Sequence, residues 1–283
     1  MSQQRTEPVR DPLEDEPATP VGGMRVAVAQ TGNGGNGLVH KAADMVVFWS
    51  GCLLFAVTTL IASLSARCLS WLLPGEFGAR LGKRLIMAVF RADLAYLRFT
   101  GRFEFDLRAL DALRADGGLV IAPNHPALLD VLLVASRLPR ITCIMKAELW
   151  NNILLGGGAR LARYIRNDSP LGMVKLAVGE LGRGSQLLVF PEGTRTVRRP
   201  VNHFKPGFAL IALRAGVPVQ TVFIETNSPF LGKGWRWWHR PRFPVIYRVR
   251  LGHRFTVDGD AKTFSAMLER YFEDELRGSG MVG

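Results

Sequence analysis

A histidine and an aspartate lie five residues apart where a strongly apolar run of the sequence ends. The run covers residues 118–122, and it leads into Asn124, His125, Pro126 and then Asp130. A carboxylate can hold the proton of one imidazole nitrogen and leave the other nitrogen free as a general base. On a straight helix two residues five apart point about 140° apart, so this pair can meet only if the chain bends at His125. Taken alone, the spacing also fits a histidine that caps a helix or packs in a core.

A second group of polar residues follows another apolar run, at residues 186–190. The chain continues as Phe-Pro-Glu-Gly-Thr-Arg over residues 190–195. Gly193 permits close approach of the backbone, Arg195 can bind a phosphate or carboxylate, and Glu192 can accept a hydrogen bond from a substrate hydroxyl. Because the carboxyl ends of parallel strands meet at one edge of a sheet, we expect this group to lie near the histidine. The alternative is an ordinary polar loop between a strand and a helix.

The elements that must position these groups alternate between strands and helices. The apolar patterns predict strands at 103–107, 118–122, 141–146, 186–190, 217–224 and 244–251, and helices near 127–137, 171–182, 206–215 and 260–277. This alternation predicts a single α/β domain over residues 99–278, with a mixed, largely central β-sheet flanked by helices. The short connecting segments argue against a further domain boundary inside it.

The N-terminal part of the chain has a different character. Residues 1–44 have no periodic apolar pattern, which predicts a disordered tail, and the first apolar run begins too late for a secretory signal. Residues 45–66 carry no charge, and as a helix they would be about 33 Å long, enough to cross a bilayer. We therefore expect a membrane-embedded helix there. The apolar stretch at 69–74 leaves open a hairpin that does not cross, and the serines and threonines leave open a buried core helix.

Residues 76–98 predict an amphipathic helix, so that residues 45–98 form a membrane-associated helical segment. This second helix fits either the membrane interface or a solvated outer face of the domain. Basic residues follow the apolar run while few precede it, and the positive-inside rule then puts the C-terminal side in the cytoplasm. The expected location is the cytoplasmic membrane, with the active site facing the cytoplasm.

The charge of the chain favours partners that carry phosphate. Lys and Arg number 36 against 24 Asp and Glu, a formal charge of +12, and residues 196–255 hold eleven basic residues and one acid, Glu225. Within them residues 235–242 mix tryptophan with arginine, as membrane headgroup regions favour. A nucleic-acid patch or a loop packed on the core is the alternative. The uncharged run at 45–66 favours membrane lipids, and no nucleic-acid partner is expected.

The sequence lacks the signatures of several common function classes. The cysteines, Cys52, Cys68 and Cys143, are odd in number and widely spaced, which favours a reducing compartment and predicts no metal site. The sequence has no GxSxG, P-loop or HExxH motif, so it lacks the commonest signatures of serine hydrolases, of nucleotide-phosphate binding and of zinc proteases.

The two polar groups together resemble the paired signature of the glycerolipid (lysophospholipid) acyltransferase family. NHPALLD at 124–130 is followed by FPEGTR at 190–195, and residues 162–166 and 217–219 resemble weaker blocks of the family. The resemblance covers roughly residues 100–260. The family includes bacterial 1-acylglycerol-3-phosphate acyltransferases, which make phosphatidate.

This resemblance implies the roles of the first five site residues. His125 would be the general base and Asp130 would orient it. Glu192, Gly193 and Thr194, from the second signature, would bind the acceptor.

The resemblance also implies where the charged and acyl parts of the substrates bind. Lys146, Arg166 and Arg195 match basic positions that handle the acceptor phosphate, and Pro218 is linked to the acyl-donor side. No acid immediately precedes Arg166, as it does in some members, which leaves the acceptor open. Segments such as 143–146 also resemble members associated with aryl-polyene lipids.

The implied reaction is direct transfer of an acyl chain from acyl-CoA or acyl carrier protein to the hydroxyl of lysophosphatidate, with no other cofactor and no metal. Backbone amides after Pro126 are candidate donors to the oxyanion. One alternative is another lyso-lipid or hydroxyl-bearing lipid as acceptor. A second is a non-catalytic protein that binds anionic lipid.

Overall fold

A central β-sheet positions the polar groups. The computed structural model describes residues 36–73, 75–236 and 239–277. The chain divides into two compact units, residues 1–40 and 41–283. Of the first unit only the start of a helix, from residue 36, is described. Of the disordered tail predicted at 1–44, residues 1–35 lie outside the described residues, and the prediction is wrong for residues 36–44, which are helical. The sheet and the site belong to the second unit.

The sheet has the order β1-β7-β6-β2-β5-β3-β4 among the described residues. Its strands are β1 (Phe103–Asp106), β2 (Leu119–Pro123), β3 (Ile141–Met145), β4 (Ile165–Arg166), β5 (Gln186–Leu188), β6 (Val219–Thr226) and β7 (Val245–Phe255). Every neighbouring pair is parallel except β6 and β7. Strands β2, β5 and β6 are buried along their whole length, because helices cover both faces of the sheet and exclude water from each.

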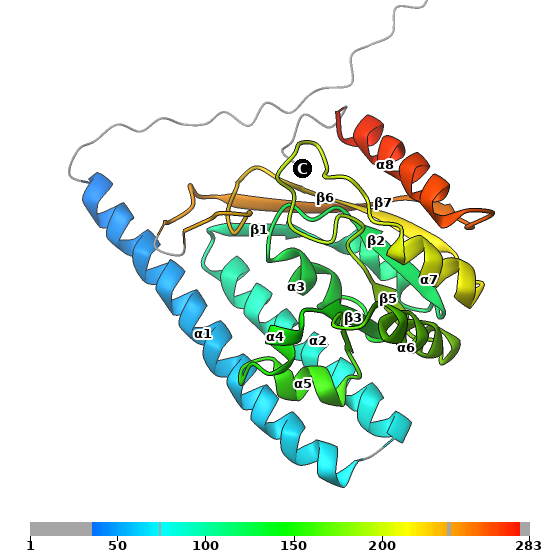
Figure 1. The fold of residues 1–283 in the computed structure, drawn as a ribbon. Helices are drawn as coiled ribbons and strands as arrows, with labels where there is room; N and C mark the ends of the chain where they lie inside the picture. The colour runs from blue at the N-terminus through cyan, green and yellow to red at the C-terminus, as the bar shows by residue number, and fades with distance from the viewer. Residues whose placement is uncertain (1–35, 74, 237–238, 278–283) are drawn as a thin grey trace, which may run out of the picture. The chain divides into compact units, whose positions relative to one another are not determined.

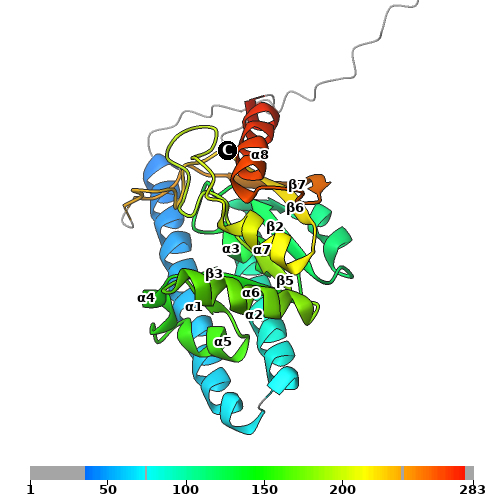
Figure 2. The same cartoon turned by 45° about the vertical axis from the view of Figure 1, so that its right-hand side comes forward.

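Two hydrophobic cores lie on the two faces of the sheet (Figures 1 and 2). One face carries α2 (Gly75–Phe99), α3 (Asp130–Ala135), α4 (Ala147–Trp150) and α5 (Gly156–Leu161), and the other carries α6 (Pro170–Gly182), α7 (Gly207–Ala215) and α8 (Ala261–Arg277). A short 3-10 helix, η1 (Arg108–Leu113), follows β1. The predicted α/β domain with a mixed central sheet flanked by helices is therefore confirmed.

The helix predicted from residue 127 begins later, at Asp130. The reason is local, because the Asp130 carboxylate accepts the backbone N–H of Ala127 at 2.8 Å and folds the four residues before the helix into turns. The short elements β4, α4 and α5 were not predicted, since none is long enough to show a period in the sequence.

The N-terminal helix α1 (Asn36–Leu72) is longer at both ends than the predicted run of 45–66. Asp44, in its polar start, forms ion pairs with Arg102 and Arg240. Within it, residues 42–72 are long and apolar enough to cross a membrane, and only 11% of the most apolar window is buried in the structure. This exposure excludes the alternative of a buried core helix. With α2, which follows directly, α1 forms a helical hairpin (Figure 1).

Polar contacts fasten one face of α1 to the domain along much of its length. Tyr96 of α2 donates a hydrogen bond to Ser50 at 2.7 Å, Thr58 donates to Asp93 of α2 at 2.9 Å, and the backbone of Gly157 in α5 donates to Ser63 at 2.9 Å. The opposite face exposes large apolar side chains, namely those of Met45, Val46, Trp49, Leu53, Val57, Ile61 and Leu64. Polar contacts therefore hold one face of α1 to the domain, and the opposite face is apolar and exposed.

A buried ion pair joins α2 to α6. Lys83 and Glu180 of α6 are both buried, with 2.9 Å between Nζ and Oε2, and Ser185 lies within hydrogen-bond distance of both. A buried charge that loses its partner is costly, whereas an apolar pair of similar size is tolerated.

We expect Lys83→Met to lower the free energy of unfolding by about 1.5–3 kcal/mol, because the buried Oε2 of Glu180 loses its charged partner while Oε1 keeps Arg183 at 3.3 Å. The double variant Lys83→Met/Glu180→Leu should regain most of this loss. Urea unfolding in detergent, followed by circular dichroism, measures both. A double variant no more stable than Lys83→Met would contradict this account of the pair.

Candidate active site

The carboxyl ends of two adjacent parallel strands bring the two polar groups together. His125 follows β2 and Glu192 follows β5, and these strands are paired in the sheet. Asn124 fixes the end of β2 to the strand on its other side, because its side-chain amide exchanges two hydrogen bonds with the backbone of Ile224 in β6, at 2.7 and 2.9 Å. These two hydrogen bonds therefore hold the backbone in place where the loop of His125 begins.

His125 and Asp130 are in direct contact. The Nδ1 atom of His125 lies 2.8 Å from Oδ2 of Asp130, and the carboxyl group is fully buried. Burial raises the pKa of the Asp130 carboxyl above its ordinary value, while the hydrogen bond from His125 acts to lower it. The imidazole stacks on the ring of Phe190, with 3.8 Å between centroids. The carboxylate and the aromatic ring together fix both the tautomer and the orientation of the histidine.

The second nitrogen of the imidazole, Nε2, is free to act as a base. Nε2 of His125 makes no hydrogen bond to any residue that the structure describes, and the side chain is 12% exposed. An imidazole that donates from Nδ1 to a carboxylate carries its lone pair on Nε2, so it can take a proton from a hydroxyl that reaches this edge of the sheet.

Glu192 holds the backbone of the catalytic loop. It is 2% exposed, and its Oε1 accepts the backbone N–H of His125 at 2.9 Å and the hydroxyl of Thr196 at 2.8 Å. Its Oε2 accepts the backbone N–H of Asn202 at 2.8 Å. Burial raises the pKa of Glu192, and these hydrogen bonds oppose the rise. Both oxygens accept protein donors, so Glu192 positions the backbone of this loop. Its contact with the acceptor stays a prediction.

The next residues of the second signature lie closer to the surface. Gly193 has a φ of +67°, a left-handed conformation that favours glycine, and the Lys205 side chain lies over it. Thr194 is half-buried. Lys205 was not predicted as a site residue, although it lies in the segment Phe204-Lys-Pro-Gly, and only the fold brings it to Gly193.

Arg195 ties a distant loop to the site. Its guanidinium donates hydrogen bonds at 2.9 Å to the backbone carbonyls of Leu231 and Gly232. The backbone N–H of Leu128 also donates to the Leu231 carbonyl, at 3.0 Å. Two amides after Pro126 that were candidate oxyanion donors are therefore already used, since Ala127 donates to Asp130 and Leu128 to Leu231.

The predicted phosphate-binding residues of the neighbouring strands lie at the same edge of the sheet. Lys146 follows β3 and Arg166 ends β4, and Arg166 is paired in register with Met145. Both side chains are exposed. Arg166 forms an ion pair with Asp168, whereas Lys146 has no ion-pair partner within the described ranges.

Pro218 is not brought to this edge. It precedes β6, and its carbonyl accepts the backbone N–H of Val120 near the start of β2 at 3.1 Å. Five residues of extended chain, about 17 Å, separate Val120 from His125. The sequence block at 217–219 therefore lies at the opposite end of the strands.

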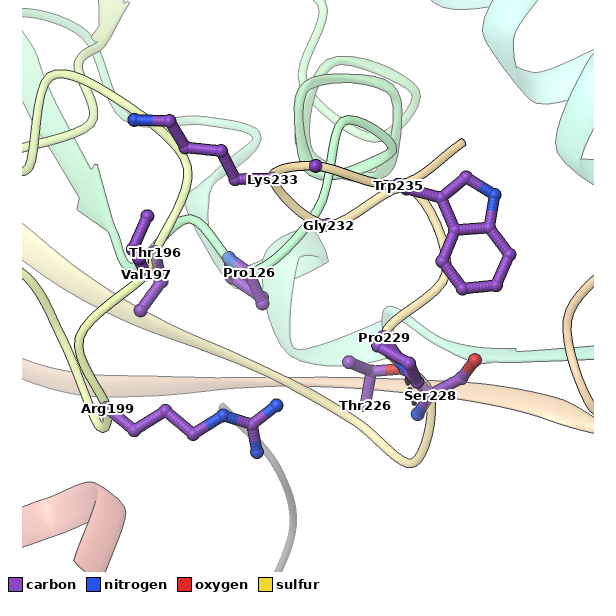
Figure 3. Close-up of a pocket in the computed structure, with 11 residues that line it drawn as sticks. Pro126, Thr196, Val197, Arg199, Thr226, Ser228, Pro229, Gly232, Lys233 and Trp235 are labelled. Carbon is purple, nitrogen blue, oxygen red and sulfur yellow. Dashed lines mark hydrogen bonds between the residues drawn. The ribbon is translucent and has the colours of Figure 1, made fainter. Parts of the chain in front are cut away.

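A pocket of about 340 Å³ lies next to Pro126, the residue after the histidine (Figure 3). It is lined by Pro126, Thr196, Val197, Arg199, Thr226, Ser228, Pro229, Gly232, Lys233, Gly234 and Trp235. The predicted membrane segment 235–242 falls partly here. Trp235 is half-buried and packs edge-on against Phe230, with 5.6 Å between ring centroids, and residues 237–238 lie outside the described residues. Trp235 thus packs on the core, as the alternative reading of that segment expected.

Comparisons with known proteins agree with this site. The sequence profile of the family described as Acyltransferase matches residues 104–225, which include His125, Asp130 and Glu192. A lyso-ornithine lipid O-acyltransferase of Pseudomonas aeruginosa is 34% identical over 122 residues, 38% of this chain and 46% of that protein. A 1-acyl-sn-glycerol-3-phosphate acyltransferase of the same organism is 23% identical over 182 residues, 62% of this chain and 68% of that protein. The matches to vertebrate lysophospholipid acyltransferases span only 28–40% of those proteins.

A solved structure has the same fold. The crystal structure of the 1-acyl-sn-glycerophosphate acyltransferase PlsC from Thermotoga maritima superposes with a TM-score of 0.63 at 18% identity, covering 85% of this chain and 96% of that one. Residues 104–225 therefore match the acyltransferase family, and this chain is similar to 1-acyl-sn-glycerol-3-phosphate and other lysophospholipid acyltransferases.

Proposed function

We propose that this protein transfers an acyl chain from a thioester donor to the free hydroxyl of lysophosphatidate, giving phosphatidate. The observation that carries the proposal is the contact of His125 with the buried Asp130, which leaves Nε2 unpaired at the sheet edge where Lys146 and Arg166 also lie. The donor is acyl-CoA or acyl carrier protein, and the reaction requires no further cofactor.

The chemical step is a direct transfer. Nε2 of His125 takes the proton of the acceptor hydroxyl as the oxygen attacks the thioester carbonyl, so that a C–O bond forms. The tetrahedral intermediate then collapses, the C–S bond breaks, and the imidazolium returns its proton to the thiolate that leaves. The buried Asp130 stabilises the imidazolium in between, as in a catalytic triad whose nucleophile is the substrate.

Replacing His125 with Ala should lower kcat by about 10²–10⁴-fold, because the hydroxyl then loses its general base. Asp130→Asn should also lower kcat strongly, since it removes the charge that stabilises the imidazolium. The assay supplies purified protein in detergent with lysophosphatidate and with acyl-CoA or acyl carrier protein donors. His203→Ala is the matched control, because His203 is exposed and pairs with Glu269 instead.

Two results would decide against the proposal. Full activity in His125→Ala would remove the histidine from the mechanism. A wild-type protein that is folded, as judged by circular dichroism, and makes no product with any lyso-lipid acceptor would favour the non-catalytic reading.

A second acceptor has a specific observation in its favour. The relative named as a lyso-ornithine lipid acyltransferase is 34% identical, against 23% for the relative named as a 1-acyl-sn-glycerol-3-phosphate acyltransferase. The unpaired Lys146 favours an acceptor that carries phosphate. Offering both lyso-lipids to the wild type separates the two acceptors.

The hairpin of α1 and α2 anchors the domain to the membrane, in this proposal on the cytoplasmic side of the cytoplasmic membrane. Because Ser50, Thr58 and Ser63 fasten α1 to the folded domain, the helix cannot cross the bilayer without drawing that domain in with it. Its exposed apolar face instead enters one leaflet, while the face that makes these polar contacts stays against the domain. This arrangement brings the site to a lyso-lipid in the same leaflet.

We expect Leu53→Asp/Ile61→Asp, on the open face of α1, to lower the partition of the protein into anionic vesicles at least tenfold, because two apolar side chains worth about 1.5–3 kcal/mol each no longer enter the lipid. Vesicle flotation after removal of detergent measures the partition. Leu176→Asp/Met267→Asp is the matched control, since both residues are exposed on helices that cover the other face of the sheet. Equal losses in the two double variants would contradict an anchoring face on α1.

A further inference from the structure

The pocket beside His125 lies on the side of β2 away from the predicted phosphate-binding residues. Thr226 and Ser228, in its wall, come from the end of β6, which is one neighbour of β2. Lys146 and Arg166 come from β3 and β4, which lie beyond the other neighbour, β5. The histidine therefore stands between two sets of cations, one on each side.

Two cations of this pocket have no partner. Arg199 comes from the loop after β5 and Lys233 from the loop after β6, so they enter the pocket from different walls (Figure 3). Both are exposed, and neither makes a hydrogen bond or ion pair with any residue that the structure describes. Among the described residues, no acid lines this pocket. An anion that enters would be met from two sides by free positive charge.

The rest of the lining is uncharged. The hydroxyls of Thr196, Thr226 and Ser228 alternate with apolar surface from Pro126, Pro229 and Trp235. Such a lining suits a slender group that carries amides and a hydrocarbon chain. Pro126, the residue after the histidine, and the two exposed cations line the same pocket, which suits a molecule that has both a reactive end and a charged end.

The pocket wall is fixed to the catalytic loop. Arg195 and the Leu128 amide both bind the Leu231 carbonyl, and a Cβ on Gly232 would lie 3.5 Å from the Pro126 carbonyl, so the 231–235 turn packs directly on the residue after His125. A ligand held by Lys233 and Trp235 is thereby held at a fixed place relative to the imidazole.

We propose that this pocket binds the phosphopantetheine arm of the acyl donor, with Arg199 and Lys233 holding its phosphate. The inference rests on the proposed acyl transfer. Acyl-CoA and acyl carrier protein carry their thioester on the same phosphate-bearing arm, so one pocket serves both donors. A transfer between two phosphate-bearing substrates needs two anion sites, and Lys146 with Arg166 provides the one for the acceptor.

The test removes the phosphate from the ligand and the charges from the protein in turn. In wild-type protein, phosphopantetheine should inhibit transfer competitively against the donor at least tenfold more strongly than pantetheine, which lacks the phosphate. In Arg199→Ala/Lys233→Ala the two inhibitors should be equally weak. The KM for either donor should rise at least tenfold, while kcat and the KM for lysophosphatidate change less than twofold.

The matched control is Arg198→Ala/Lys175→Ala, which removes the same charge. Arg198 is the neighbour of Arg199 but pairs with Glu273 of α8, and Lys175 is exposed on α6. An unchanged donor KM in Arg199→Ala/Lys233→Ala, an equal rise in the control, or a rise confined to the KM for lysophosphatidate would overturn the proposal.

Calorimetry with phosphopantetheine alone keeps this inference separate from the proposed function. Binding to the wild type that is lost in Arg199→Ala/Lys233→Ala supports the pocket even if no acyl acceptor is found. If transfer is observed and phosphopantetheine binds both proteins equally, the function stands and the pocket assignment falls.

Discussion

Two buried carboxylates hold His125, one through its ring and one through its backbone, and the rest of the site depends on this clamp. Asp130 binds Nδ1 of the imidazole, and Glu192 accepts the backbone N–H of the same residue. Burying a carboxylate is costly unless it is hydrogen-bonded. Here the Ala127 amide donates to Oδ2 of Asp130, whose Oδ1 has no partner among the described residues, and the Asn202 amide and the Thr196 hydroxyl donate to Glu192. The loops at 125–130 and 190–202 are therefore shaped by the need to satisfy these two groups.

Burying the charged form of these two carboxylates lowers the free energy of unfolding. Burial raises the pKa of both Asp130 and Glu192 in the folded protein. For an acid whose folded pKa lies above its unfolded value, the folded state binds more protons, so the free energy of unfolding falls as the pH rises from the unfolded value, about 4, through the folded one. The charged carboxylates that hold His125 therefore exist at the less stable, higher-pH end of that window. A site that needs a charged group in a dry place generally has this conflict between stability and function.

The sequence was most informative where signals are local. The long apolar strands, the amphipathic helices and the contact of His125 with Asp130 follow from patterns within a few residues, and the shared edge of β2 and β5 follows from the rules of parallel sheets. Arg199 and Lys233 were missed because only the path of long loops brings them to the pocket that Pro126 lines, and Lys205 was missed because only the fold brings it to Gly193. Pro218 shows the converse, since a sequence block matched the family while the residue lies at the far end of its strand. The role of Glu192 also needed coordinates, because sequence alone does not tell which donors a carboxylate meets.

The central claim is that Asp130 fixes the tautomer of His125 so that Nε2 is an unprotonated base. The most direct measurement is the ¹⁵N NMR spectrum of the histidine side chains in protein labelled at histidine, with His125→Gln used to assign the resonance. We expect the neutral imidazole of His125 to carry its proton on Nδ1, with a free lone pair on Nε2. A proton on Nε2 of the neutral ring would contradict this claim.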